Sequence, residues 1–135
     1  MAFPFLSTKS QKRSIGIKGS IMQKPILHLK SGEFKVTQNG EVLGTVLGSC
    51  VAVCIFDHQK KIGGMNHYLL PESNPSASTG HPLNFGDTSL TAMLKRFKDL
   101  GSHPHHLQAK IVGGAKMKTD SQVPTVGERN IQIAK

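Results

Sequence analysis

The sequence predicts a single domain of mixed α/β fold. Short apolar stretches with strand patterning occupy residues 33–70, and a helical spacing of apolar residues follows near residue 90. With 135 residues the chain can bury one modest core, but not two cores of ordinary size. No apolar run approaches the length that a bilayer span requires, so neither a transmembrane helix nor membrane insertion is predicted.

Strand patterns surround the most apolar part of the chain. The predicted strands span residues 33–37, 51–56, 62–70 and 107–112. The first alternates apolar with polar residues up to an Asn39-Gly40 turn signal, and the third stops at Pro71. Residues 42–47 continue the apolar pattern until Gly48-Ser49 interrupts it.

One loop and one helix separate the last two strands. Residues 71–84 are rich in Pro, Gly, Ser and Asn, a composition that predicts a loop. Apolar residues then recur at helical spacing, at Leu90, Met93, Leu94, Phe97 and Leu100. Asp87 or Thr88 is the expected N-cap, and Gly101 is expected to end the helix.

The positive charge is concentrated at the N-terminus. Residues 1–32 contain no acidic side chain, and the chain as a whole has a formal charge of +9. We expect residues 1–30 to be a basic, flexible arm and residues 31–135 to form the domain. A solubilising tail, or one attracted to an acidic protein surface, is favoured over nucleic-acid binding because the chain has one Tyr and no Trp for base stacking.

The two cysteines are expected to be free thiols. Cys50 and Cys54 lie along one predicted strand, where four residues of extended chain separate their Cα atoms by about 13 Å. A disulfide requires less than about 7 Å. Free thiols suit a reducing compartment, and the N-terminal residues lack a secretory pattern, so a cytoplasmic location is predicted.

Cys50 is the strongest candidate for chemistry. It follows Gly48-Ser49, where the backbone can turn sharply and its N–H groups can face an incoming oxygen. A thiol attacks as the thiolate and needs a base; His67, on an apolar strand, is the best placed histidine, and Thr45 could orient its ring. Composition alone favours the plainer alternative of a buried cysteine, a core histidine and an ordinary strand threonine.

Other kinds of site find little support in the sequence. Cys54 lies mid-strand between apolar residues and is assigned to the core. His103, His105 and His106 share a short loop without a cysteine or carboxylate at a recognised ligand spacing, so no metal site is predicted. The glycine pairs lack the flanking residues of a nucleotide-binding loop, so no cofactor is predicted either.

Four segments of the chain form a distinctive set of motifs. They are Leu47 to Asp57, containing Gly48-Ser49-Cys50; Lys61 to Pro71, containing Asn66-His67-Tyr68; Ala109 to Ala115; and Gly127-Glu128-Arg129-Asn130. Together, and in this order, they resemble the CheD family, and the resemblance extends over residues 30–134.

The resemblance implies a protein-glutamine glutaminase that deamidates glutamines of methyl-accepting chemotaxis proteins to glutamate without a cofactor. The family's nucleophile falls on Cys50, its histidine on His67 and its threonine on Thr45. Thioester formation would then be supported by backbone N–H groups at Gly48 and Ser49. The phosphatase CheC is an implied partner.

The implied fold is an α/β sandwich of packed mixed β-sheets flanked by helices, similar to the catalytic domain of cytotoxic necrotising factor toxins. Family members generally continue for several tens of residues past Gly127-Glu128-Arg129-Asn130, so the C-terminal part of the family domain is expected to be absent here. That expectation keeps two alternatives open. One is a catalytically weak or inactive module that binds chemoreceptors or CheC, and the other, less favoured, is a basic nucleic-acid-binding protein.

Overall fold

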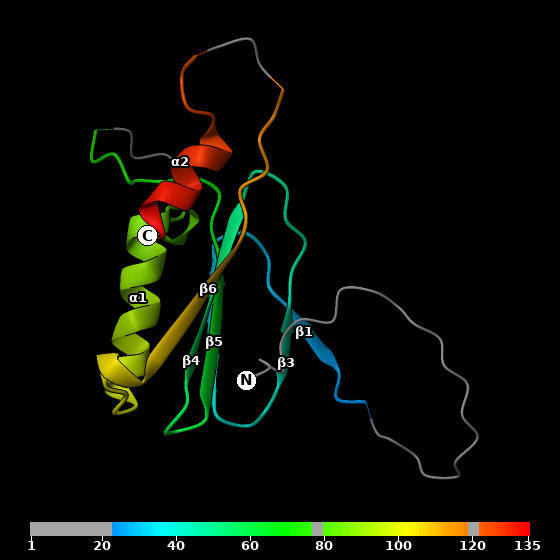
Figure 1. The fold of residues 1–135 in the computed structure, drawn as a ribbon, viewed down its shortest axis with the longest axis vertical. Coiled ribbons are helices and arrows are strands. Elements are labelled where there is room, and N and C mark those ends of the chain that lie inside the picture. Colours follow the sequence, from blue (N-terminus) through cyan, green and yellow to red (C-terminus); the bar gives the residue numbers. More distant parts are fainter. Residues whose placement is uncertain (1–22, 77–79, 119–121) are drawn as a thin grey trace, which may run out of the picture.

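The computed structural model describes residues 23–76, 80–118 and 122–135 as a mixed α/β fold (Figure 1). The strands are β1 (Ile26–His28), β2 (Glu33–Thr37), β3 (Val42–Gly44), β4 (Val51–Asp57), β5 (Ile62–His67) and β6 (Leu107–Gly113). The helices are α1 (Gly86–Asp99) and α2 (Val126–Ile133), and short 3-10 turns at Pro82–Asn84 and Pro104–His106 precede α1 and β6. The predicted α/β class is confirmed.

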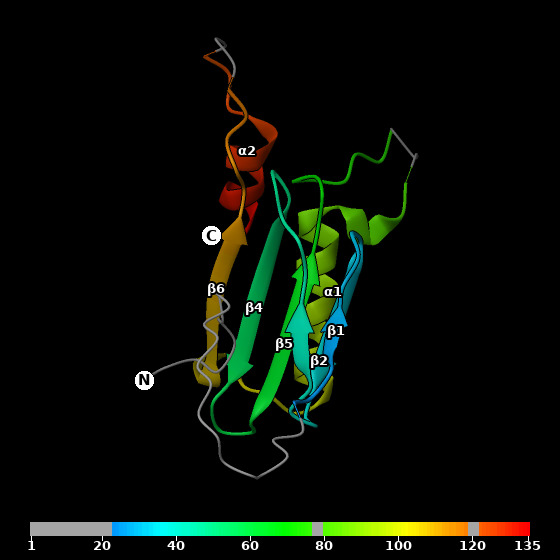
Figure 2. The same ribbon diagram turned by 90° about the vertical axis from the view of Figure 1, so that its right-hand side faces the viewer.

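The elements form three layers. Strands β2, β5, β4 and β6, in that order, make an antiparallel sheet, and β1 pairs in parallel with β3 in a separate two-stranded sheet. Helix α1 covers one face of the larger sheet, and the β1–β3 pair lies on its other side (Figures 1 and 2). Helix α2 lies beyond the end of the sheet where β4 begins and β6 ends (Figure 1).

Each face of the larger sheet has its own core, because side chains along a strand alternate between the two faces. The core on the α1 side comprises Val51, Val53, Ile55, Ile62, Tyr68, Met93 and Phe97. The core on the β1–β3 side comprises Leu29, Leu43, Ala52 and Met65, with Leu47 and Cys54 packed against it. The central strands β4 and β5 are therefore buried on both faces.

Most strand predictions are confirmed, but the predicted strand 62–70 is too long. Strand β5 ends at His67, and Tyr68 adds only a single bridge to Val51. The N–H groups of Leu69 and Leu70 then bond to the Asn84 carbonyl instead of to a neighbouring strand. The chain leaves the sheet there because the turn before α1 offers an alternative acceptor. In the apolar run 42–47, only residues 42–44 form a strand.

The predicted helix is confirmed, but its predicted cap is wrong. Helix α1 begins at Gly86 and its N-cap is Phe85, which makes no side-chain capping bond. The Asp87 carboxylate accepts hydrogen bonds from the N–H and hydroxyl groups of Ser73 in the preceding loop. The helix ends as expected before Gly101, which has a positive φ of 80°.

Strands β1 and β3 and helix α2 were not predicted. Strand β1 falls inside the basic arm of residues 1–30, so the last residues of that arm belong to the fold; residues 1–22 lie outside the described residues. Helix α2 begins with a capping box between Thr125 and Glu128, a Thr-x-x-Glu pattern that was legible in the sequence. Neither helix of the described ranges is long and apolar enough to cross a membrane.

Strand β5 lets α1 approach closely because it carries Gly64 at the contact. A Cβ at this position would lie 2.7 Å from the Phe97 ring and 3.1 Å from Val36. The Phe97 ring therefore fills the space above the strand, and its side chain is 1% exposed.

We predict that Phe97→Ala lowers the free energy of unfolding by about 3–5 kcal/mol, since it removes a buried ring and leaves a cavity. The matched control on the same helix is Leu94→Ala, because Leu94 is 44% exposed. Its cost should stay below about 1 kcal/mol. Urea denaturation of both variants measures the difference, and equal losses would contradict the assignment of Phe97 to the core.

Candidate active site

Cys50 lies on a bend between β3 and β4, one residue before β4 begins. Its thiol is free and partly exposed, and Cys54 is also free, as predicted. The bend has open space beside it, because a Cβ built on Gly48 would have no neighbour within 4 Å. An incoming group can thus approach the loop that carries the thiol.

The pairing of β4 with β5 determines how far His67 lies from the Cys50 bend. Val51 and Tyr68 pair directly in an antiparallel bridge. Alternation along β5 places His67 on the face opposite to Tyr68, and extended geometry one residue before β4 would make Cys50 its diagonal neighbour on that face. Ordinary sheet geometry separates such partners by about 7–8 Å, within reach of an imidazole ring.

A threonine fixes the ring of His67. The Thr45 hydroxyl oxygen lies 2.8 Å from His67 Nδ1 and 2.8 Å from the Leu29 carbonyl oxygen. The carbonyl can only accept, so the single hydroxyl proton goes to Leu29, and the hydroxyl oxygen must accept from Nδ1–H. The neutral ring is thereby held as the Nδ1-protonated tautomer, with its lone pair on Nε2.

That lone pair is free to act as a base. His67 is 5% exposed, and its Nε2 atom is buried without a hydrogen-bond partner in the described part of the chain. Burial lowers the pKa of His67 below its ordinary value of 6.5, and the nearby Leu29 carbonyl opposes this shift only in part. The ring is therefore neutral at physiological pH and can take a proton at Nε2.

Cys54 has a different environment from Cys50. It lies inside β4 and packs against the core between the two sheets. Burial raises the pKa of its thiol, an effect that the charge of Lys110 reduces only partly. A thiol with a raised pKa is mostly protonated at neutral pH and is a weak nucleophile.

The sequence did not predict that three residues contact the Cys50 bend, which comprises Gly48, Ser49 and Cys50. Gly114 and Ala115 donate backbone hydrogen bonds to the loop, and Asn130 donates one through its side chain. The motifs at residues 109–115 and 127–130 contain all three, but nothing in the sequence shows that they meet a loop more than 60 positions earlier.

The loop histidines lie away from Cys50. His103 stacks on His105 with ring centroids 5.0 Å apart, and both precede β6, whose far end reaches the Cys50 loop. The described ranges contain no group of three or more His, Cys, Asp or Glu side chains arranged to hold a metal.

The chain is thus a mixed α/β protein that carries a free cysteine on an open bend and, at the end of β5, a neutral histidine whose ring is oriented by a threonine. Residues 69–135 match the family model described as CheD chemotactic sensory transduction. The chain belongs to the CheD family, as its curated relatives establish over most of its length.

The relatives come from archaea and bacteria. A probable chemoreceptor glutamine deamidase CheD of Methanococcus maripaludis strain C6 is 40% identical over 111 residues, which cover 82% of this chain and 71% of the relative. The corresponding protein of Caldanaerobacter subterraneus is 34% identical, with 84% and 73% covered. The probable CheD 1 of Shewanella oneidensis is 35% identical, with 82% and 55% covered.

We predict that the tautomer of His67 depends on the Thr45 hydroxyl. Nitrogen NMR should show the wild-type ring protonated at Nδ1, and Thr45→Ala should raise the share of the Nε2-protonated tautomer because Nδ1 loses its hydroxyl acceptor at 2.8 Å. Thr45→Ser keeps the hydroxyl and is the matched control. An unchanged Nδ1–H tautomer in Thr45→Ala would contradict the hydrogen-bond assignment.

We also predict that His67 makes the fold sensitive to acid. The unfolded chain protonates this histidine near its ordinary pKa of 6.5, whereas the folded protein does so only at lower pH. Its contribution to stability is therefore complete above that value and is lost as the pH falls below it.

The test is the loss of unfolding free energy between about pH 7 and about pH 5, which should be smaller in His67→Gln than in the wild type. The comparison isolates His67 from the other histidines and from Glu33, which pairs with it from β2. Equal losses in the two proteins would contradict the lowered pKa.

Proposed function

We propose that this protein is a protein-glutamine glutaminase that deamidates glutamine side chains of methyl-accepting chemotaxis proteins. Cys50 is the proposed nucleophile and His67 the proposed base, with Thr45 orienting the ring. The observation that carries the proposal is the Thr45–His67 hydrogen bond, because it leaves Nε2 as the basic atom on the face where extended geometry would place Cys50. The names of the relatives, chemoreceptor glutamine deamidases, supply the substrate class.

The proposed reaction proceeds through a thioester. His67 Nε2 takes the thiol proton of Cys50, and the thiolate adds to the side-chain carbonyl carbon of the glutamine. Backbone N–H groups of the Gly48-Ser49-Cys50 bend stabilise the negative oxygen of the tetrahedral intermediate. The C–N bond breaks, and the leaving nitrogen takes the proton from His67 and departs as ammonia. Water, deprotonated by His67, then hydrolyses the thioester to glutamate and regenerates the thiol. These steps need no metal and no organic cofactor.

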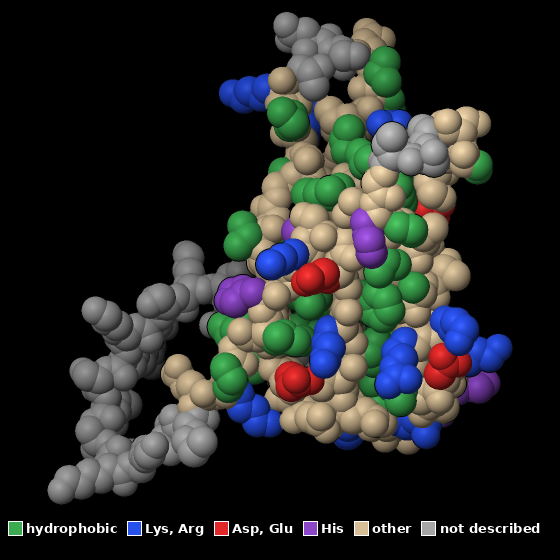
Figure 3. Space-filling model, turned by 180° about the vertical axis from the view of Figure 1, so that it is seen from behind, with side chains coloured by type: hydrophobic (Ala, Val, Ile, Leu, Met, Phe, Trp, Pro, Cys, Tyr) green, Lys and Arg blue, Asp and Glu red, His purple; other side chains and the backbone are tan. Residues whose placement is uncertain are grey.

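Charge supports the encounter with an acidic helical receptor. The chain carries 17 Lys and Arg against 8 Asp and Glu. Viewed from behind, the basic side chains are interspersed with acidic ones and do not form a single patch (Figure 3). Six of the basic residues, Lys9, Lys12, Arg13, Lys18, Lys24 and Lys30, belong to residues 1–30. We propose that net charge speeds association at low salt, while the site itself selects the glutamine.

The finer expectations from the family resemblance are part of the same proposal. Residues 31–135 would be the deamidase domain, with β1 packed on it, and its sheets would correspond to a sandwich like that of the cytotoxic necrotising factor catalytic domain. The phosphatase CheC would be a partner, and the cytoplasm the place of action. A module that binds receptors or CheC with weak or no turnover is the alternative.

Ammonia release from a purified receptor signalling fragment tests the proposal. Wild-type protein should release ammonia, and mass spectrometry should locate glutamines converted to glutamate in the fragment. Cys50→Ala should abolish release, and His67→Ala should reduce it by about 10²–10⁴-fold because the general base is lost.

Cys54→Ala is the matched control and should retain activity within about threefold, because this thiol packs in the core and has a raised pKa. Full release by Cys50→Ala would refute the nucleophile. Folded wild-type protein that binds the fragment and releases no ammonia would favour the binding module.

A further inference from the structure

The Cys50 bend has all three of its carbonyl groups fixed from one side. The carbonyls of Gly48, Ser49 and Cys50 accept hydrogen bonds from Ala115 N–H at 2.9 Å, Asn130 Nδ2 at 3.0 Å and Gly114 N–H at 2.8 Å, respectively. These donors come from the two residues that follow β6 and from α2, more than 60 residues later in the chain. The bend is thus oriented by the C-terminal part of the fold.

The hydrogen bonds to the Gly48 and Ser49 carbonyls also set the direction of the Ser49 and Cys50 N–H groups. In a trans peptide the C=O of one residue and the N–H of the next point in opposite directions. The bond from Asn130 to the Ser49 carbonyl therefore turns the Cys50 N–H away from α2, and the bond from Ala115 to the Gly48 carbonyl turns the Ser49 N–H away from the chain that follows β6. Within residues 23–76, 80–118 and 122–135, neither N–H donates to a protein acceptor. Both are available to an oxyanion.

Asn130 is fully buried where it donates a hydrogen bond to the Ser49 carbonyl. It is 0% exposed, and its amide nitrogen donates both hydrogens, one to Ser49 O and one to Leu69 O at 2.9 Å. Its own backbone carbonyl accepts the Tyr68 hydroxyl at 2.6 Å. One side chain thus ties the residue before Cys50 to the segment that follows His67.

The surroundings of the Asn130 Oδ1 atom also indicate that the side-chain NH₂ group faces Ser49. Its Oδ1 atom is buried and has no hydrogen-bond partner in the described residues. A buried unpaired acceptor is unfavourable, but turning the amide over would point Oδ1 at two carbonyl oxygens. The two carbonyls therefore impose the orientation that presents the NH₂ group to Ser49.

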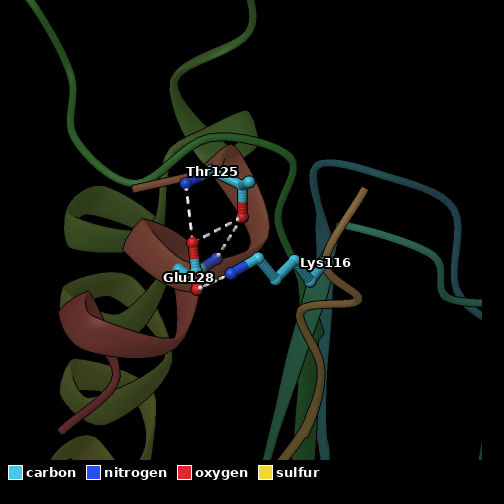
Figure 4. A network of polar contacts seen from close by, with 3 residues as sticks. All are labelled: Lys116, Thr125 and Glu128. Carbon is cyan, nitrogen blue, oxygen red and sulfur yellow. Dashed lines mark hydrogen bonds and ion pairs between the residues drawn. The ribbon is translucent and has the colours of Figure 1, made fainter. Parts of the chain in front are cut away.

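Helix α2 is fixed well enough to hold Asn130 in place. Figure 4 shows the capping box between Thr125 and Glu128 and the reach of Lys116 to the same carboxylate, with Lys116 Nζ 3.2 Å from Glu128 Oε1. The helix also lies directly on the chain after β6, since a Cβ on Gly127 would be 2.7 Å from Gly114 O. The first turn of α2 therefore packs against Gly114 and Ala115, the two residues that donate hydrogen bonds to the Cys50 bend.

We propose that Asn130 is a positioning residue that orients the Ser49–Cys50 peptide so that the Cys50 N–H donates to the oxyanion of the tetrahedral intermediate. Asn130 acts through the backbone and does not touch the substrate. The proposal rests on the proposed deamidase function, but its geometric part concerns the Cys50 amide alone and can be tested without turnover.

The kinetic test is Asn130→Ala in deamidation of the receptor fragment. Loss of alignment of an oxyanion donor should lower kcat by about 10- to 100-fold while KM changes by less than about threefold, because the contact matters in the transition state. Ser89→Ala is the matched control: it removes a buried hydrogen bond to Asn66 on the α1 side of the sheet and should lower stability without lowering kcat. Equal kcat values for wild type and Asn130→Ala would overturn the proposal, as would an equal fall in kcat in Ser89→Ala.

A binding test separates this proposal from the function itself. A peptide aldehyde that mimics the glutamine side chain adds the Cys50 thiol across its C=O bond to form a hemithioacetal. In the wild type the Cys50 amide proton should move downfield in NMR, and in the isosteric Asn130→Asp it should move less, since a carboxylate cannot donate to Ser49 O. An unmoved Cys50 amide in the wild-type adduct would overturn the proposal even if Asn130 variants fail to fold. Wild type that forms the shifted adduct and releases no ammonia would instead overturn the proposed function.

Discussion

The antiparallel pairing of β4 with β5 is the constraint on which the rest of the site depends. Both strands are buried on both faces, and a one-residue slip would exchange the side chains of the two different cores, which would then no longer pack. The bridge between Val51 and Tyr68 determines how far His67 lies from the Cys50 bend. A shift by one residue would move His67 to the α1 side, away from Thr45, and so remove the base that we propose for Cys50.

The polar groups of the site are held by backbone atoms from distant segments. Leu29, directly after β1, supplies the carbonyl that takes the Thr45 proton, and this single acceptor decides the tautomer of His67. On the other side, the chain after β6 and helix α2 hold the carbonyls of the Cys50 bend. The segment after β1 thus orients the His67 ring, and the C-terminal segment orients the peptide groups of the Cys50 bend. Each is short, and each is anchored to the larger sheet.

Periodicity predicted the parts of the fold that bury apolar side chains at regular intervals. The polar–apolar alternation of β2, the continuous apolar run of β4 and the helical spacing in α1 are strong signals because packing in a core requires them. The end of β5, the cap of α1 and strand β1 were not predicted correctly. Each depends on a hydrogen bond with a partner far along the chain, such as the bond from Leu69 N–H to the Asn84 carbonyl. The pattern of hydrophobic residues in the sequence does not reveal such a bond.

The sequence by itself determined the fold class, the free thiols and the residue types that thiol chemistry needs, because these follow from composition, local spacing and motif resemblance. It offered Thr45 only as one possible orienting residue and assigned no role to Asn130. The tertiary structure alone decided that the Thr45 hydroxyl lies between Leu29 and His67, and that Asn130 reaches Ser49 across 81 positions of sequence. The physical reason is that hydrogen bonds depend on distance and direction in space, which only the folded chain defines.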